Sequence, residues 1–447
     1  MTVALTKTKV EQALSQSFEA VAAKLPGGGA VAEARKAAIG AFAALGLPHR
    51  RIEQWKYTDL RSALREALAP AVGGATKASP ADIDAALEEL AALDAYRMVF
   101  VDGVHAPEHS RLGGAEGLEI GSLAAALAKP GASTGDDLGA GSATGQEAVI
   151  ALNTAFMTDG AVVRFRKGAR LDKPLILVFA RAGREGRLVT TRNLIELGEA
   201  AHATVIEAHV ALPGAAPGQA NTLSDVSLGD GARLAHVKCT LAGKAASHLA
   251  TWLATLGKAA TYHAFQLTAE SGLVRNNVFA TLKGEGAKLD ISGSFLGRGT
   301  EHIDTTLVVD HAVPRCESRE LFKGVLADRA HGVFQGKVIV RPNAQKSDGK
   351  QMAQVLMLSE DAEFDSKPEL EIHADDVVCG HGSTAAEIDE DLLFYMLSRG
   401  IPAAEARALL IESFIVDAID KVEDERLRAA LAGIATRRLA GLATSRS

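Results

Sequence analysis

The spacing of apolar residues divides the chain into a helical beginning, a β-rich middle and a helical end. In the first part, apolar side chains recur at intervals of three or four residues, which indicates amphipathic helices. Ser79 followed by Pro80 is a favourable N-cap with proline in the first turn, so another helix begins there. We therefore expect helices over residues 10–25, 31–45 and 80–93, and a strand and turn over 97–103.

From about residue 150 to 385 the pattern changes to alternating, β-branched segments in which one turn motif recurs. A leucine is followed a few residues later by alanine, with glycine or acidic residues between them. The motif begins at Leu197, Leu228, Leu256, Leu282, Leu326 and Leu358. Fixed turn chemistry at near-regular intervals is what the stacked rungs of a β-solenoid require. A Greek-key sandwich would also have many short strands, so the periodicity favours a β-helix only slightly.

After Thr384 the apolar spacing is helical again. A helix over residues 389–398 is followed by Gly400, a typical residue just beyond a helix C-terminus, and further helices are expected over 402–422 and 423–442. The helix over 402–422 carries a broad apolar arc formed by Leu410, Ile411, Phe414, Ile415, Ala418 and Ile419. The arc is wider than one packing partner needs. It is therefore either core between neighbouring helices or, in part, a docking surface for another protein.

Composition and charge exclude several classes of protein. The net charge of −7 offers no basic face to nucleic-acid phosphates. Three widely spaced cysteines do not form a disulfide framework and fit a reducing cytosol. No apolar run could span a bilayer and the N-terminus lacks the apolar core of a signal peptide, so a soluble, cytoplasmic protein is expected. The Gly- and Ala-rich residues 129–146 lack the lysine of a phosphate-binding loop and are expected to be a flexible linker, with no nucleotide site on this chain.

The strongest candidate for chemistry is the pair formed by Cys379 and His381. The two residues lie at the end of a short expected strand and are two positions apart, so their side chains project from one face. A thiolate beside an imidazole suits a metal such as iron or zinc. One pair is only half a metal site, however, and a buried cysteine next to a hydrogen-bonded histidine is the alternative interpretation.

Other residues are weaker candidates for metal binding. His302 and Asp304 share a strand face, with His311 nearby, but residues that flank an apolar strand are more often turn residues. Cys316 is either a ligand or a small core residue. Cys239 lies on an alternating strand and is expected to be structural.

Six motifs, in order along the chain, resemble the SufB/SufD family of iron–sulfur cluster assembly scaffolds. They are Gly46–Leu60, Ala151–Phe156, Asp172–Pro174, Arg315–Gly324, Phe334–Lys337 with Asn343–Lys346, and Lys367–Thr384 with Leu393–Ile401. The Gly-Leu-Pro element with Trp-Lys-Tyr-Thr, and the absence of an N-terminal cysteine cluster, resemble the SufD branch more than the SufB branch.

The resemblance implies an α+β chain with a central right-handed parallel β-helix. Residues 1–147 would be a mainly helical region ending in the Gly-rich linker, 148–385 the β-helix and 386–447 a C-terminal helical domain. It also implies a non-catalytic scaffold in a SufB–SufC–SufD complex, with ATP hydrolysis supplied by SufC. SufC would dock on the C-terminal helices, at Leu410, Phe414, Ile415 and Ile419.

The same resemblance implies that a SufB-like subunit meets the C-terminal end of the β-helix. There His381, with Cys379 as a second ligand, would hold iron or a transient iron–sulfur cluster. A homodimer is one alternative for the isolated chain. Because stacked rungs satisfy one another's hydrogen bonds, the β-helix is expected to stay folded in a chain that ends before Ile388.

Two alternatives for function stay open. A SufB-like subunit that itself nucleates the cluster would need more cysteines on the β-helix than Cys239, Cys316 and Cys379. A β-helical carbohydrate-active enzyme would set several carboxylates along one groove, whereas the carboxylates of this β-region are expected mostly at turns.

Overall fold

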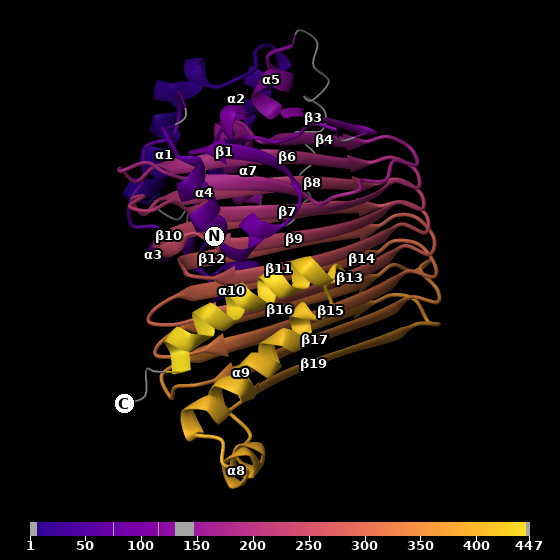
Figure 1. Cartoon of the computed structure of the whole chain (residues 1–447). Helices are drawn as coiled ribbons and strands as arrows, with labels where there is room; N and C mark the ends of the chain where they lie inside the picture. The colour runs from indigo at the N-terminus through magenta and orange to yellow at the C-terminus, as the bar shows by residue number, and fades with distance from the viewer. Residues whose placement is uncertain (1–6, 75, 115, 130–146, 444–447) are drawn as a thin grey trace, which may run out of the picture.

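The structure is a computed structural model that describes residues 7–74, 76–114, 116–129 and 147–443. Within these ranges the chain forms a β-solenoid of two stacked parallel sheets, with helices at both ends of the sequence (Figure 1). This confirms the α+β architecture with a central parallel β-helix.

The strands of the two sheets alternate along the chain, and from β4 onward each strand pairs in parallel with the strand two positions away. Sheet A contains β3 (Leu118–Ser122), β4 (Ala161–Phe165), β6 (Leu188–Leu197), β8 (Gln219–Leu228), β10 (Gly243–Leu256), β12 (Ser271–Leu282), β14 (His302–His311), β16 (His331–Val340) and β18 (Glu363–Ile372). Sheet B contains β1 (Tyr96–Val101), β2 (Val104–His105), β5 (Leu175–Arg181), β7 (His202–Ala211), β9 (Arg233–Leu241), β11 (Thr261–Ala269), β13 (Lys288–Gly297), β15 (Glu317–Leu326), β17 (Asp348–Met357) and β19 (Val378–Ala386). The pairs β1–β2 and β3–β4 are antiparallel.

The recurring leucine motif forms turns of the solenoid, as its regular spacing predicts. The first four leucines, from Leu197 to Leu282, each end a strand of sheet A. Leu326 ends a strand of sheet B and Leu358 directly follows another, so these two turns lie at the opposite edge. The change of edge explains why the spacing between Leu282 and Leu326 breaks the near-regular interval.

Stacked turns at the first edge approach so closely that they require glycine. A Cβ atom on Gly284 would lie 1.9 Å from the backbone nitrogen of Lys258 in the preceding rung. A Cβ atom on Gly257 would lie 2.7 Å from Asp230 Oδ1, one rung earlier. Each of these turns therefore rests directly on the backbone of its neighbour.

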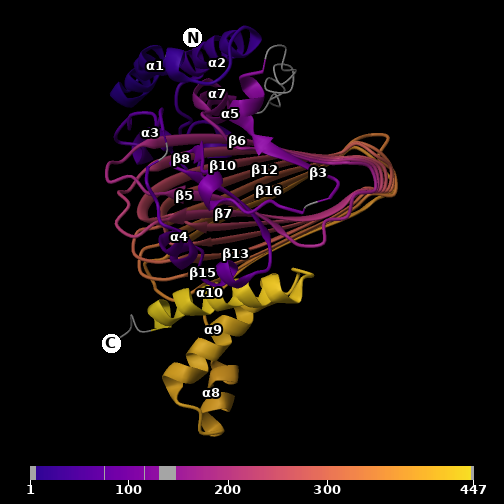
Figure 2. The same ribbon diagram turned by 45° about the horizontal axis from the view of Figure 1, so that its top comes forward.

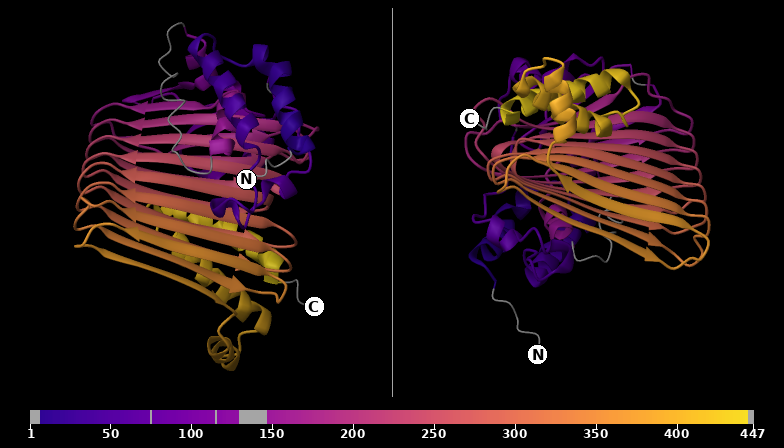
Figure 3. Two further views of the ribbon diagram at one scale, coloured as in Figure 1. Left: turned by 180° about the vertical axis from the view of Figure 1, so that it is seen from behind. Right: turned by 90° about the horizontal axis from the view of Figure 1, so that it is seen from below.

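The N-terminal segment covers both faces of the early rungs. Its helices are α1 (Lys9–Val21), α2 (Ala30–Leu45), α3 (Leu60–Ala63), α4 (Pro80–Leu87), α5 (Leu123–Leu127) and α7 (Glu147–Phe156), with 3-10 turns η1 (Ala22–Lys24), η2 (Glu53–Trp55), η3 (Glu88–Ala92) and η4 (Pro107–His109). Helices α1, α2 and α7 pack on the outer face of sheet A, where Phe42 shares an apolar cluster with Leu249 and Leu273. Figure 3 shows these helices and the C-terminal helices on opposite faces of the solenoid.

The C-terminal helices are α8 (Glu390–Ser398), α9 (Ala403–Ile419) and α10 (Glu425–Ala443). Helices α9 and α10 lie on the outer face of sheet B (Figure 2), and their apolar side chains share a core with Leu267 and Val325. Arg438 of α10 forms ion pairs with Glu88 of η3 and with Glu270, so the two ends of the chain meet. In contrast, α8 projects beyond the last rung and buries none of its side chains.

Most expected elements agree with the structure, and two details differ. The helix that begins at Pro80 ends at Leu87 and continues as the 3-10 turn η3. Cys379 and His381 begin strand β19, whereas the sequence predicted that they end a strand. The expected linker lies, apart from Lys129, outside the described residues. Among the described helices, none is long and apolar enough to cross a membrane.

Candidate functional site

Cys379 and His381 lie on β19, the last strand of sheet B, at the open end of the solenoid (Figure 1). Within sheet B this strand pairs only with β17. Alternate residues of a strand face the same way, so the two side chains project from one face, as the sequence predicts. His381 is exposed, and Cys379 is half-buried against an apolar cluster that contains Val338 and Ala374.

Two rows of side chains run along the interior face of sheet B to this pair. The rows are Ser318, Gly349 and Cys379, and beside them Glu320, Gln351 and His381. This face is the inside of the solenoid, because Gln351 hydrogen-bonds across to Glu369 of sheet A. A Cβ atom on Gly349 would lie 3.4 Å from Ser318 Oγ and 3.7 Å from Cys379 Sγ, so the glycine leaves the space between these two atoms free of a side chain.

Glu320 and Gln351 carry polar atoms that the surrounding protein does not satisfy. Glu320 Oε1 and Gln351 Oε1 are buried without a hydrogen-bond partner. The amide of Gln351 is fixed by its nitrogen, which donates to the carbonyl oxygen of Glu369 at 3.1 Å. Burial raises the pKa of Glu320 to about 8 and also raises the pKa of the Cys379 thiol. Burial therefore favours the neutral forms of both groups.

Sequence reasoning missed Glu320 and Gln351, although the chain carries a signal for the first. On β15, alternation places Glu320 on the same face as Ser318 and Phe322. Phe322 faces the apolar core, and a glutamate two residues before it on the same face of the strand must therefore also be buried. Gln351 has no comparable signal, because the first four residues of β17, Asp-Gly-Lys-Gln, contain no large apolar side chain that would mark the inner face.

Across the described residues, no three histidine, cysteine, aspartate or glutamate side chains lie close enough together to hold a metal ion. A metal ion on the Cys379–His381 pair would therefore complete its coordination with water or with groups of another protein.

His302 and Asp304 share a face of β14, as expected, but their contacts are structural. Asp304 forms a fully buried ion pair with Arg275 and accepts a hydrogen bond from Thr58. His302 Nε2 lies 2.8 Å from the Thr58 hydroxyl, and burial lowers the pKa of His302 to about 4. The Arg275 guanidinium in turn lies 3.9 Å from the ring of Trp55. His302, Asp304 and Arg275 thus anchor the N-terminal Trp-Lys-Tyr-Thr motif to the solenoid. This structural role takes the place of the metal-binding role considered for His302 and Asp304.

The remaining candidates also belong to the core. His311 Nε2 lies 3.0 Å from Ser318 Oγ, and burial lowers the pKa of His311 to about 4. Cys316 is fully buried with a raised thiol pKa. Cys239 is buried and its pKa is raised to about 12, which agrees with the structural role expected for it.

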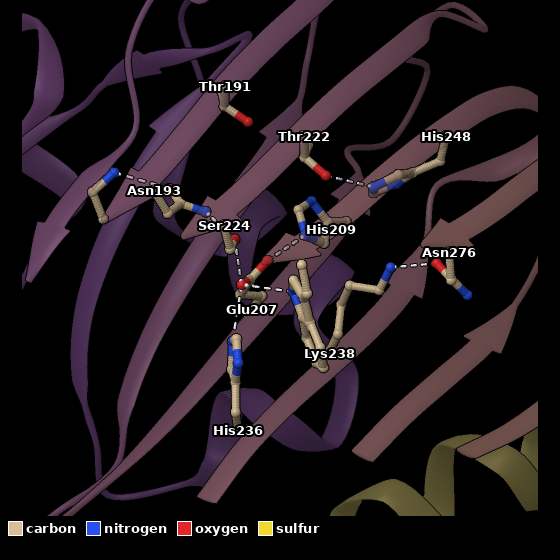
Figure 4. A network of polar contacts seen from close by, with 12 residues as sticks. Thr191, Asn193, Glu207, His209, Thr222, Ser224, His236, Lys238, His248 and Asn276 are labelled. Atoms are coloured by element: carbon tan, nitrogen blue, oxygen red, sulfur yellow. Dashed lines mark hydrogen bonds and ion pairs between the residues drawn. The ribbon is translucent and has the colours of Figure 1, made fainter. Parts of the chain in front are cut away.

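A second polar group lies deeper in the solenoid, around Glu207 of β7 (Figure 4). Its carboxylate accepts hydrogen bonds from Ser224 at 2.7 Å, from His236 Nε2 at 2.9 Å and from Trp252 Nε1 at 3.2 Å, and His209 Nε2 lies at 3.3 Å. Burial alone would raise the pKa of Glu207, but the hydrogen bonds from His209 and His236 outweigh it and hold the pKa well below its usual range.

Lys238 supplies the opposite charge to this network. It occupies the position opposite Glu207 on the neighbouring strand β9 and donates to Asn276 Oδ1. Burial lowers its pKa to about 8. Because the carboxylate has several donors and a buried cation nearby, the network is a self-contained polar core and not an open binding site.

The expected partner-binding arc on α9 is largely core. Ile415 and Ile419 are fully buried against sheet B. Phe414 is partly buried, with the Lys323 ammonium 4.5 Å from its ring centre, and Leu410 is half-buried. Ile415 and Ile419 are therefore corrected from docking residues to core residues.

The exposed apolar surface of the C-terminal region lies instead on α8. The exposed fractions are 51% for Leu392, 72% for Phe394, 56% for Tyr395 and 40% for Leu397. Since soluble proteins rarely gather several large apolar side chains at one exposed helix, α8 is the better candidate for a docking surface.

Comparisons with known proteins agree with this architecture. Residues 9–177 match the family model described as the SufBD protein N-terminal region, and residues 179–414 match that of the SUF system FeS cluster assembly SufBD core domain. The chain is 31% identical over 387 residues to the iron-sulfur cluster assembly protein SufD of Escherichia coli, covering 86% of this chain and 87% of that protein. It is 30% identical over 401 residues to a SufBD family protein of Synechocystis, covering 87% and 86%. The SufD protein of Bacillus subtilis is 26% identical over 293 residues, covering 65% and 67%.

Proposed function

Because the chain belongs to the SufBD family of iron–sulfur cluster assembly proteins, we propose that it is a SufD-type scaffold that assembles clusters together with a SufB-like subunit and a SufC-like ATPase. The observation that carries the proposal is the Cys379–His381 pair on the exposed last rung. Iron or the nascent cluster is the cargo of this pair, held for transfer and not kept as a resident cofactor.

The solenoid suits this task because it holds the pair rigidly while leaving one side open. His381 is exposed and offers a borderline-soft nitrogen ligand, and Cys379 offers sulfur from the same face. The missing ligands would come from the SufB-like subunit docked on the last rung. The same end surface would serve in a homodimer of the isolated chain.

The proposed docking surface for the SufC-like ATPase is α8, supported by its four exposed apolar side chains. The chain itself acts as a non-catalytic scaffold in the cytoplasm, and the energy of ATP hydrolysis comes from the partner.

The test is cluster formation in the reconstituted complex with His381→Ala. We expect iron and sulfide content to fall by about tenfold or more, because the pair loses its nitrogen ligand. Complex formation, measured by gel filtration, should be unchanged, since an exposed side chain contributes little to packing.

Cys379→Ala is the companion variant. A comparable fall indicates that both residues bind the cargo, and a small effect indicates that His381 binds alone. His373→Ala is the matched control, because His373 is also exposed near this end of the solenoid and its imidazole hydrogen-bonds to Glu371. Unaltered iron and sulfide content in His381→Ala would refute the proposed site.

A further inference from the structure

The end of the solenoid contains two buried oxygen atoms with unused hydrogen-bonding capacity. Glu320 Oε1 and Gln351 Oε1 have no partner, and each residue is 3% exposed. Their residues are opposite one another on β15 and β17, and neighbouring strands are about 4.8 Å apart. A buried polar atom without a partner destabilises the fold. Two such atoms on register partners of neighbouring strands therefore indicate a ligand that donates hydrogen bonds.

The orientation of Gln351 is set by the opposite sheet. Its nitrogen donates to Glu369 of β18, and its oxygen occupies the space over Gly336, where a Cβ atom would lie 2.0 Å from it. The amide thus presents an acceptor to the interior, and Gly336 makes room for it.

The oxygen pair lies directly behind the candidate cargo site. Gln351 is the register partner of His381 on the next strand, and Glu320 is one strand further in. In the adjacent row, Gly349 leaves the space between Ser318 and Cys379 free of a side chain. The two acceptors and the Cys379–His381 pair therefore face the same end of the interior.

Resting on the proposed function, we propose that Glu320 and Gln351 are positioning residues that accept hydrogen bonds from water molecules bound to a metal ion at Cys379 and His381. Neither residue touches the ion, which agrees with the absence of a three-ligand group among the described residues. Groups that act through the ligands or waters of a metal typically change its affinity by about 10–100-fold.

This arrangement specifies the form in which the cargo arrives. Water on a divalent ion donates hydrogen bonds, whereas the sulfide atoms of a finished cluster only accept them. Two acceptors behind the pair thus suit a hydrated divalent transition-metal ion and do not suit a preformed cluster. The site receives iron as an ion, before sulfur is added.

The experiment is an anaerobic titration of the full-length chain with Co²⁺, whose absorption spectrum reports thiolate and imidazole ligands. We expect Glu320→Leu and Gln351→Leu, which remove the acceptor oxygens, each to weaken Co²⁺ binding by about tenfold, with the thiolate band retained in the saturated protein. Glu320→Asp, which keeps the carboxyl group, should recover part of the affinity. The matched control is Glu317→Gln, which alters a glutamate of the same strand that faces outward and pairs with Lys288.

His381→Ala separates the failure of this inference from that of the proposed function. If His381→Ala loses Co²⁺ while Glu320→Leu and Gln351→Leu bind it like the wild type, the positioning role is overturned and the proposed function stands. If His381→Ala also binds Co²⁺ like the wild type, the cargo site itself is refuted. Thermal unfolding of each variant distinguishes a lower affinity from a loss of fold, and Gln351→Leu provides the test should Glu320→Leu not fold.

Discussion

Glu320 shows how a single buried residue links stability to pH. Its pKa is raised to about 8 by burial, so between the ordinary carboxyl range and pH 8 the folded chain holds a proton that the unfolded chain has lost. The free energy of unfolding therefore falls as pH rises through that window, because the unfolded state binds fewer protons.

Glu320→Gln should remove this dependence, because the amide resembles the protonated carboxyl group and does not ionise. As pH rises across the window, the free energy of unfolding of the variant should exceed that of the wild type by up to about 1.4 kcal/mol more for each pH unit. Urea unfolding at about pH 5, 6.5 and 8 measures the slope. Equal slopes in the variant and the wild type would show that Glu320 ionises normally in the fold.

At the residue scale, the sequence reveals types of residue and their alternation but not their partners. It correctly predicted that Cys379 and His381 share a face. It could not reveal that Asp304 is neutralised by Arg275, because that contact depends on the register between β12 and β14. The same limit hid Gln351, whose place beside His381 is also a matter of register.

At the scale of elements, the turns were predictable because their chemistry is local. A leucine followed a few residues later by alanine, with glycine or acidic residues between them, marks a place where the chain must turn on top of an earlier turn, and these turns were predicted correctly from Leu197 onward. The docking face of α9 was not predictable in this way. Its apolar arc is visible in the sequence, but whether sheet B or a partner covers it depends on the tertiary structure.

Gly284→Ala should destabilise the solenoid by about 1–3 kcal/mol, the usual cost of forcing an extra group into a packed region. The new methyl group would clash with the backbone of Lys258. Gly286→Ala, two residues on, is the control. A Cβ atom added at Gly286 would meet no atom within 4 Å. The variant would carry only the backbone strain of a φ of +73°, which costs about 1 kcal/mol. Thermal and urea unfolding should rank Gly284→Ala as the less stable variant, and the reverse order would contradict the close stacking.

Phe394→Ser should weaken binding of the SufC-like ATPase by about tenfold or more without lowering stability. Phe394 is 72% exposed on α8, so its truncation leaves no cavity in this chain, yet a large aromatic side chain is a typical anchor at an interface. Surface plasmon resonance measures the affinity. The control is Leu45→Ser, because Leu45 is an exposed apolar residue on α2, in the N-terminal region. Equal affinities for Phe394→Ser and the wild type would remove α8 from the interface.

At the scale of the whole molecule, the C-terminal helices are integral to the solenoid. The sequence suggested that the β-helix would stay folded without the residues from Ile388 onward. The structure places α9 and α10 over the outer face of sheet B, in one core with Leu267 and Val325. Patterns of spacing reveal that such helices exist but not which surface of a distant sheet they cover.

A chain that ends before Ile388 should therefore aggregate or unfold at lower temperature than the full chain, because it exposes a broad apolar face of sheet B. Light scattering measures the aggregation of the purified chain, and circular dichroism during heating measures its unfolding temperature. As control, a chain with polar substitutions at Leu392 and Phe394 keeps α9 and α10 and should remain soluble. A truncated chain as soluble and stable as the full one would restore the original expectation.

The ion pair between Arg438 and Glu88 also bears on the order in which the chain folds during its synthesis. The two residues are 350 positions apart, and Arg438 lies in the last helix of the chain. At a synthesis rate of about 5–20 residues per second, Glu88 is added to the chain roughly 20–70 seconds before Arg438. The rungs can stack one by one during that interval, each on the turn before it. The part of sheet B beneath α9 and α10 stays exposed until translation is almost over, so the growing chain presents this apolar surface, and is prone to aggregate, for most of its synthesis.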